Sequence, residues 1–180
     1  MYKLLAFLLV VFSMYSHSQN VRIATFNVSM DGTNYVEQGQ TPNGDELLKN
    51  LRGGEHKQIR NIAEIIQQQR PDIILLNEFD YSNQSAVDVQ NFLKHYLKVS
   101  QNNNKFIDYP YFYSAAVNTG VDSGMDLDKD GLVSGTKGDA YGFGYYPGHY
   151  GMLVLSKFPI QLENVRTFQY FLWKDMPGNL

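Results

Sequence analysis

The N-terminal region of the chain contains a strand, a helix and a second strand, in that order. Val21–Phe26 mixes β-branched and aromatic residues, which favour a strand. Four apolar residues then recur at the spacing that places them on one face of a helix over residues 55–69: Ile59, Ile62, Ala63 and Ile66. Pro71 ends this helix, and the continuous apolar run Ile73–Leu76 is typical of a strand buried on both faces. This order predicts a parallel βαβ unit and therefore an α/β fold class.

The rest of the chain alternates predicted elements with long loops. Residues 31–54 are polar and carry turn signals, with a short helical turn at Glu46–Leu51. A second amphipathic helix is predicted between residues 85 and 97. Three further segments are rich in residues that favour strands: Tyr111–Val117, Met152–Ser156 and Arg166–Trp173. Residues 118–150 are rich in glycine, and a loop of this length in a compact domain is usually functional or mobile.

The first residues follow the pattern of a secretory signal peptide. Lys3 precedes the apolar run Leu4–Phe12, and small residues at Ser16 and Ser18 suit cleavage after residue 18. The alternatives are a buried N-terminal strand and a membrane anchor, but the run is well short of the ~20 residues that span a bilayer. We therefore expect a signal peptide over residues 1–18, a mature chain over 19–180 without a transmembrane segment, and a secreted or periplasmic location.

Composition excludes several classes of site. The chain has 15 Lys and Arg against 18 Asp and Glu, a formal net charge of −3, so it lacks the basic surface of a protein that binds duplex DNA tightly. It has no cysteine, which leaves neither disulfides nor a thiolate metal site.

Two polar residues follow the first two predicted strands. Asn27 comes directly after the first strand, and Glu78 comes shortly after the second. Ligand sites in open α/β sheets collect at the carboxyl ends of strands. Glu78 offers a hard oxygen ligand for Mg²⁺ or Mn²⁺, and the Asn27 amide can bond a phosphate oxygen or a metal-bound water. The alternative is local, with Asn27 starting a turn and Glu78 capping the segment that follows.

Three segments of the chain together resemble a known family. They are Arg22–Asn27, Arg70–Glu78 and Tyr150–Ile160, in the order and spacing found in the first half of the endonuclease/exonuclease/phosphatase superfamily. That superfamily includes DNase I-like nucleases, abasic-site endonucleases, inositol-phosphate phosphatases and sphingomyelinases. The resemblance implies a metal-dependent phosphoester hydrolase, either a nuclease or a phosphatase. It also implies a four-layer α/β sandwich of the DNase I-like kind, of which this chain is expected to be a partial, N-terminal portion, truncated before the second half.

The resemblance also assigns roles to residues. Asn27 is expected to contact the phosphate region, and Glu78 is expected to bind the catalytic Mg²⁺. The family's later Asp-Asn and Asp-His motifs do not occur here, because Gly138-Asp139 leads into Ala140 and no aspartate precedes His149. We therefore expect the catalytic set to be incomplete in this chain. His149 is a further candidate for a general base, with a structural role at a loop–strand junction as the competing interpretation.

A second possible metal site lies in the glycine-rich region. Asp126, Asp128 and Asp130 precede Gly131 in the pattern of the first half of a calcium loop. An EF-hand is excluded, because its twelfth position would hold a glutamate and here holds Lys137. A local Ca²⁺ site completed by Asp122 or by backbone carbonyls, and a solvated acidic turn, both remain open. This insertion, with the sequence over residues 138–156, resembles secreted bacterial members of the superfamily.

The substrate is the least constrained feature. Aromatic residues interleaved with glycine are suited either to stacking on bases or to internal packing: Tyr141, Phe143, Tyr145, Tyr146 and Tyr150. We expect a phosphate-ester substrate, either nucleic acid or a small phosphoester, and infer no protein partner. The alternative function is a non-catalytic fragment or a calcium-stabilised extracellular binding domain.

Overall fold

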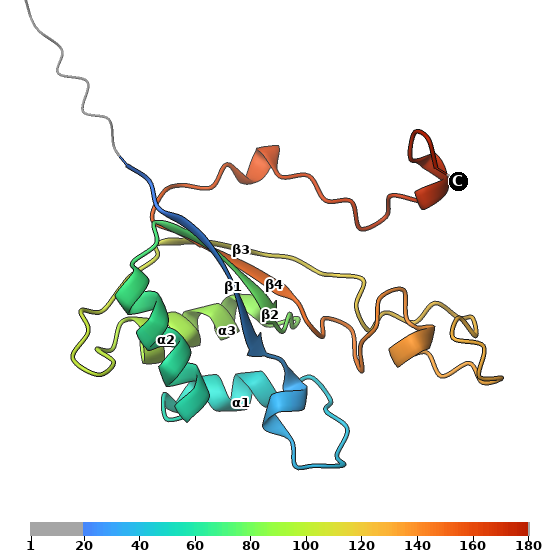
Figure 1. Cartoon of the computed structure of the whole chain (residues 1–180), viewed down its shortest axis with the longest axis horizontal. Helices are drawn as coiled ribbons and strands as arrows, with labels where there is room; N and C mark the ends of the chain where they lie inside the picture. Colours follow the sequence, from blue (N-terminus) through green and yellow to red (C-terminus); the bar gives the residue numbers. More distant parts are fainter. Residues whose placement is uncertain (1–19, 180) are drawn as a thin grey trace, which may run out of the picture.

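The computed structural model describes residues 20–179, and the predicted signal peptide lies outside them. Within these residues a four-stranded sheet carries helices on one face (Figure 1). The strands are β1 Ile23–Met30, β2 Ile73–Phe79, β3 Tyr111–Ser114 and β4 Met152–Ser156. The α-helices are α1 Glu46–Gly53, α2 Lys57–Gln69 and α3 Ser85–Phe92, the last continued by a π-helical turn at Leu93–Leu97. Short 3₁₀ turns are η1 Gly32–Tyr35, η3 Lys137–Asp139, η4 Leu162–Asn164 and η5 Trp173–Asp175.

The sheet is mixed, with strand order β1-β2-β4-β3. β1 and β2 are parallel and in register from Ile23 opposite Ile73 to Asn27 opposite Asn77, with α2 between them in the sequence. β4 runs antiparallel to both β2 and β3. The predicted βαβ unit and the α/β fold class are confirmed, and the arrangement is consistent with part of a DNase I-like fold.

The core lies between the helices and one face of the sheet. The predicted apolar stripe of α2 is buried, and it shares one cluster with alternate residues of β2 and β4: Ile74, Leu76, Leu153 and Leu155. Burying each such side chain contributes about 1.5–3 kcal/mol, so this cluster fixes the register of β2 against β4.

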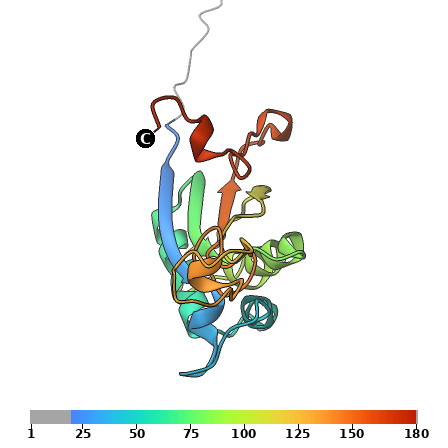
Figure 2. The same cartoon turned by 90° about the vertical axis from the view of Figure 1, so that its right-hand side faces the viewer.

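The opposite face of the sheet is more open than the sequence predicts. Ile73 and Leu75 are only half-buried, so the expectation that β2 is buried on both faces is wrong. The segment after β4 passes on this side of the sheet (Figures 1 and 2). Its residues 166–169 line an apolar cavity of about 450 Å³ together with Leu75 and Val154.

The strand predicted at Arg166–Trp173 does not form, because this segment crosses a face of the sheet instead of pairing with an edge strand. Its aromatic side chains therefore stay in water, with Tyr170 88% exposed.

None of the helices formed by residues 20–179 is long and apolar enough to cross a membrane.

Candidate functional site

The carboxyl ends of the parallel strands β1 and β2 form the edge of the sheet that we call the rim. β1 continues past its predicted end to Met30, so Asn27 lies inside the strand. Asn27 pairs with Asn77, the residue before Glu78, and the structure thus places both predicted site residues on neighbouring strands at the rim.

A β-bulge shapes β1 at this position. The pairing passes from Asn27–Asn77 to Met30–Phe79, so β1 carries one residue more than β2 over this interval. Ser29 in the bulge has a φ of 46°, and its backbone N–H donates to Asn27 Oδ1 at 3.0 Å. Because Oδ1 is engaged locally, the amide protons of Asn27 are left for an acceptor at the rim.

Glu78 itself adopts a left-handed backbone, with a φ of 57°. This conformation interrupts the alternation of β2, because Leu76 and Phe79 are both buried against the helices. Regular pleating would instead turn Glu78 toward the core. A left-handed non-glycine residue costs on the order of 1–3 kcal/mol, and such residues cluster at functional sites. The strain therefore presents a half-exposed carboxylate at the rim while keeping Phe79 in the core.

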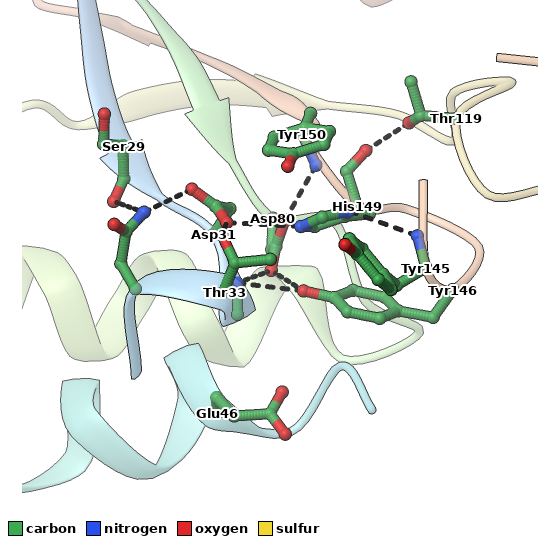
Figure 3. A network of polar contacts seen from close by, with 12 residues as sticks. Ser29, Asp31, Thr33, Glu46, Asp80, Thr119, Tyr145, Tyr146, His149 and Tyr150 are labelled. Carbon is green, nitrogen blue, oxygen red and sulfur yellow. Dashed lines mark hydrogen bonds and ion pairs between the residues drawn. The ribbon is translucent and has the colours of Figure 1, made fainter. Parts of the chain in front are cut away.

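Behind the rim, the carboxylate of Asp80 joins the end of β2 to two other segments, the turn after β1 and the loop before β4 (Figure 3). One oxygen accepts the backbone N–H of Gly32 at 2.7 Å and the hydroxyl of Tyr146, and the other accepts the backbone N–H of Tyr150 at 2.9 Å. Asp80 is 4% exposed. Burial raises its pKa to about 6, although the hydrogen bonds act in the opposite direction.

Asp31 and His149 form a second buried contact beside Asp80. Asp31 Oδ1 lies 3.2 Å from His149 Nε2 and accepts the backbone N–H of Thr33 at 3.0 Å. Burial alone would raise the pKa of Asp31, but the hydrogen bonds from His149 and Thr33 outweigh it and hold that pKa below its ordinary value. The pair fastens the loop before β4 to the turn after β1.

His149 is fully buried, and both of its ring nitrogens are engaged. Nδ1 accepts the backbone N–H of Tyr145 at 3.3 Å, so Nε2 carries the proton that faces Asp31. The ring stacks on Tyr150 with the centroids 3.6 Å apart. This geometry matches the structural interpretation of His149, since no free nitrogen faces the rim.

Glycines let the loop approach β2 closely. A Cβ on Gly151 would lie 2.7 Å from the carbonyl oxygen of Phe79, and one on Gly148 would overlap the carbonyl of Tyr81. Gly148 also has a φ of 95°, which side chains rarely tolerate. Figure 2 shows the loop of residues 118–150, called the glycine-rich loop below, in front of the ends of β1 and β2.

The Asp-rich part of this loop gathers three carboxylates. Asp126, Asp128 and Asp130 place oxygens within 4.8 Å of one another, and together they could hold a metal ion. Asp122 stands outside this group, and its carboxylate accepts the backbone N–H of Gly124 at 2.7 Å.

Three structural carboxylates were missed by sequence reasoning. Asp139 is buried in the glycine-rich loop, accepts the backbone N–H of Leu127 and both the N–H and hydroxyl of Ser134, and has a pKa lowered by the Ser134 hydrogen bonds. Asp31 and Asp80 follow the ends of β1 and β2, and this position is the only sequence signal that could have found them.

Comparison with known proteins supports one assignment. No curated protein and no solved structure matches the chain. The model of the Endonuclease/Exonuclease/phosphatase family matches residues 24–180, which include the rim and all of the four strands except Ile23, the first residue of β1. That family acts on phosphoester substrates and generally uses divalent metal ions. The chain therefore belongs to the endonuclease/exonuclease/phosphatase family.

Proposed function

We propose that this protein is a secreted, metal-dependent phosphoester hydrolase in which Glu78 binds Mg²⁺ or Mn²⁺ and Asn27 orients the phosphate. The left-handed conformation of Glu78 carries the proposal, because it places a carboxylate at the rim beside Asn27 at a cost in backbone strain.

The donors at the rim fit such an ion. Mg²⁺ favours oxygen ligands, keeps several waters and needs only one or two carboxylates from the protein. Glu78 is half-exposed and provides one carboxylate with room for those waters. A bound ion would neutralise charge on the phosphate oxygens. The amide of Asn27, held through Oδ1 by Ser29, would donate to a phosphate oxygen and set its orientation.

The other titratable residues near the rim serve the scaffold. Asp31, Asp80 and His149 are buried and hydrogen-bonded, which leaves them poorly placed to take a proton from water. We therefore propose that residues 20–179 supply no general base at the rim, and that this chain binds metal and hydrolyses phosphodiesters slowly or not at all.

Metal titration tests this proposal. Isothermal titration calorimetry of the purified protein with Mn²⁺ should show an affinity that falls at least about tenfold in Glu78→Gln. Glu64→Gln, which changes a half-exposed glutamate on α2, is the matched control and should bind like the parent. Equal affinity in both variants would contradict the assignment of Glu78. Turnover of bis-p-nitrophenyl phosphate that is lost in Glu78→Gln would show that the chain needs no further base.

The location can be tested separately. Expression of the whole chain in a secreting bacterium, followed by N-terminal sequencing of the exported product, should find Gln19 as the first residue. Retention of the intact chain inside the cell would exclude export.

The grouping of Asp126, Asp128 and Asp130 favours a second candidate function, a calcium-stabilised extracellular binding domain. We propose that these three carboxylates bind Ca²⁺, which prefers oxygen ligands and is abundant outside cells. Terbium luminescence, displaced by Ca²⁺, should be lost in Asp128→Asn and kept in Asp122→Asn, because Asp122 lies outside the group. Equal signals from both variants would leave the loop as a solvated acidic turn.

A further inference from the structure

The segment Ala140–Tyr146 presents three of its four aromatic residues to water. Tyr141 and Phe143 are 63% and 55% exposed, and Tyr145 is half-exposed, whereas the alternate residues Ala140, Gly144 and Tyr146 are buried. In a strand-like segment that packs on a core, the larger side chains normally face inward. Here the small residues Ala140 and Gly144 face inward with Tyr146, while the other three rings face outward.

Backbone contacts hold this outward arrangement in place. The N–H of Gly120 donates to the carbonyl of Gly142 at 2.8 Å, and Thr119 forms a bridge with Gly142. A Cβ on Gly144 would lie 2.6 Å from the backbone nitrogen of Gly120. The segment is therefore tied closely to residues 119–120, and the direction of its rings is fixed by that attachment.

The rings form a continuous row that reaches the rim. Phe143 contacts Tyr145 with centroids 6.0 Å apart, Tyr145 contacts His149 at 5.5 Å, and His149 stacks on Tyr150 at 3.6 Å. Tyr150 lies near Glu78, because the residues that directly follow them are paired: the N–H of Phe79 donates to the carbonyl of Gly151 at 3.1 Å. The row thus leads from the proposed phosphate site to the exposed end of the segment.

The charge around the row suits one kind of ligand. Lys137 Nζ lies 5.4 Å from the centre of the Tyr145 ring and supplies a cation beside the row. The protein as a whole is acidic, which disfavours binding through the backbone of a duplex. Aromatic rings can stack on nucleobases only when the base faces are uncovered, and a nucleic-acid strand places such faces in succession beside its phosphates.

We propose that Phe143, Tyr145 and Tyr150 form a stacking surface for unpaired nucleobases of a strand whose phosphate lies at Glu78. The phosphate position rests on the proposed function, whereas stacking on Phe143 and Tyr145 requires only the exposed rings. The substrate class is then single-stranded nucleic acid or the unpaired end of a duplex.

Fluorescence anisotropy with a labelled single-stranded oligonucleotide tests the proposal. The Glu78→Gln protein is used so that the strand is not cleaved, and Phe143→Leu is introduced into it. Loss of the ring should weaken binding about 5- to 150-fold. Tyr141→Leu is the matched control, because Tyr141 is also exposed on the same segment and lies outside the row of ring contacts. It should bind as the Glu78→Gln parent does.

Three results would overturn the stacking surface. They are equal binding by the Phe143→Leu and control proteins, equal affinity for the strand and for a blunt duplex of the same sequence, and Phe143-dependent binding to vesicles of neutral phospholipid, which would mark a lipid-facing segment. Mn²⁺ titration of Phe143→Leu with Glu78 intact separates the two proposals. If this variant binds Mn²⁺ as the parent does, and if loss of the Phe143 ring does not change oligonucleotide affinity, only the stacking surface is excluded and the metal site stands.

Discussion

The carboxylates of Asp31 and Asp80 lie in the interior behind the rim, whereas those of Asp128 and Asp130 lie in water on the glycine-rich loop. Asp80 accepts donors from segments that are distant in the sequence, and Asp31 contacts the distant His149 as well as accepting donors from its own turn. The second pair accepts only N–H groups from its own loop. A carboxylate that is surrounded by protein donors can hold a scaffold together, and one that faces water is available to a cation.

Removal of Asp80 should give the largest effect. Asp80→Ala leaves the hydroxyl of Tyr146 and the N–H of Tyr150 without an acceptor and Gly32 with the Tyr146 oxygen alone, and we expect a loss of about 3–5 kcal/mol in the free energy of unfolding. Asp128→Ala, measured without calcium, should stay within about 0.5 kcal/mol of the parent. Urea denaturation measures both. Similar losses of stability in the two variants would show that the buried and the exposed carboxylates do not differ in their contribution to the fold.

The pH dependence of stability should be the next largest effect. Burial raises the pKa of Asp80 in the folded state to about 6, above the ordinary aspartate pKa of 3.8, so the folded state binds this proton more tightly than the unfolded state does. The contribution of this group is therefore most favourable below pH 4 and falls as the pH rises to about 6, by about 3 kcal/mol. The charge is costly even though its hydrogen bonds are needed.

Urea unfolding of the metal-free protein at pH 4.5, 5.5 and 6.5 would measure this slope. Asp80→Asn has no proton to release and should flatten it, whichever absolute stability the variant has. Asp31 acts in the opposite sense, because its pKa is lowered. Its contribution to stability is present at higher pH and is lost only as the pH falls below the ordinary pKa of an aspartate. A slope that Asp80→Asn leaves unchanged would show that the Asp80 proton does not produce it.

The same two regions show how much of the fold and of the candidate site the sequence could predict. Periodicity identified α2 and the βαβ unit, and the family resemblance directed attention to Asn27 and Glu78. The buried contacts were beyond such reasoning, because Asp31 and His149 are separated by 118 positions and meet only after the loop packs on the rim. The left-handed Glu78 was missed for a related reason, since it depends on how Phe79 reaches the core.

A smaller effect should follow from changing His149. His149→Phe keeps a ring that can stack on Tyr150 but leaves Asp31 without its Nε2 donor, so we expect a loss of about 1–3 kcal/mol. His149→Gln retains a donor and should lose less. Mn²⁺ affinity at Glu78 should change little in either variant if His149 is an anchor. Loss of metal affinity with full stability would instead give His149 a direct part in the site.

The smallest effect concerns the exposed carboxylates. Binding of Ca²⁺ to the folded protein stabilises it by an amount set by the ratio of free calcium to the dissociation constant, about 1 kcal/mol for a weak extracellular site at millimolar calcium. Thermal unfolding with Ca²⁺ and with a chelator should therefore differ for the parent and for Asp122→Asn, but not for Asp128→Asn. Asp80 cannot contribute to this difference, because its oxygens are already filled by protein donors. A calcium shift that survives in Asp128→Asn would move the cation site away from the exposed group and toward the rim.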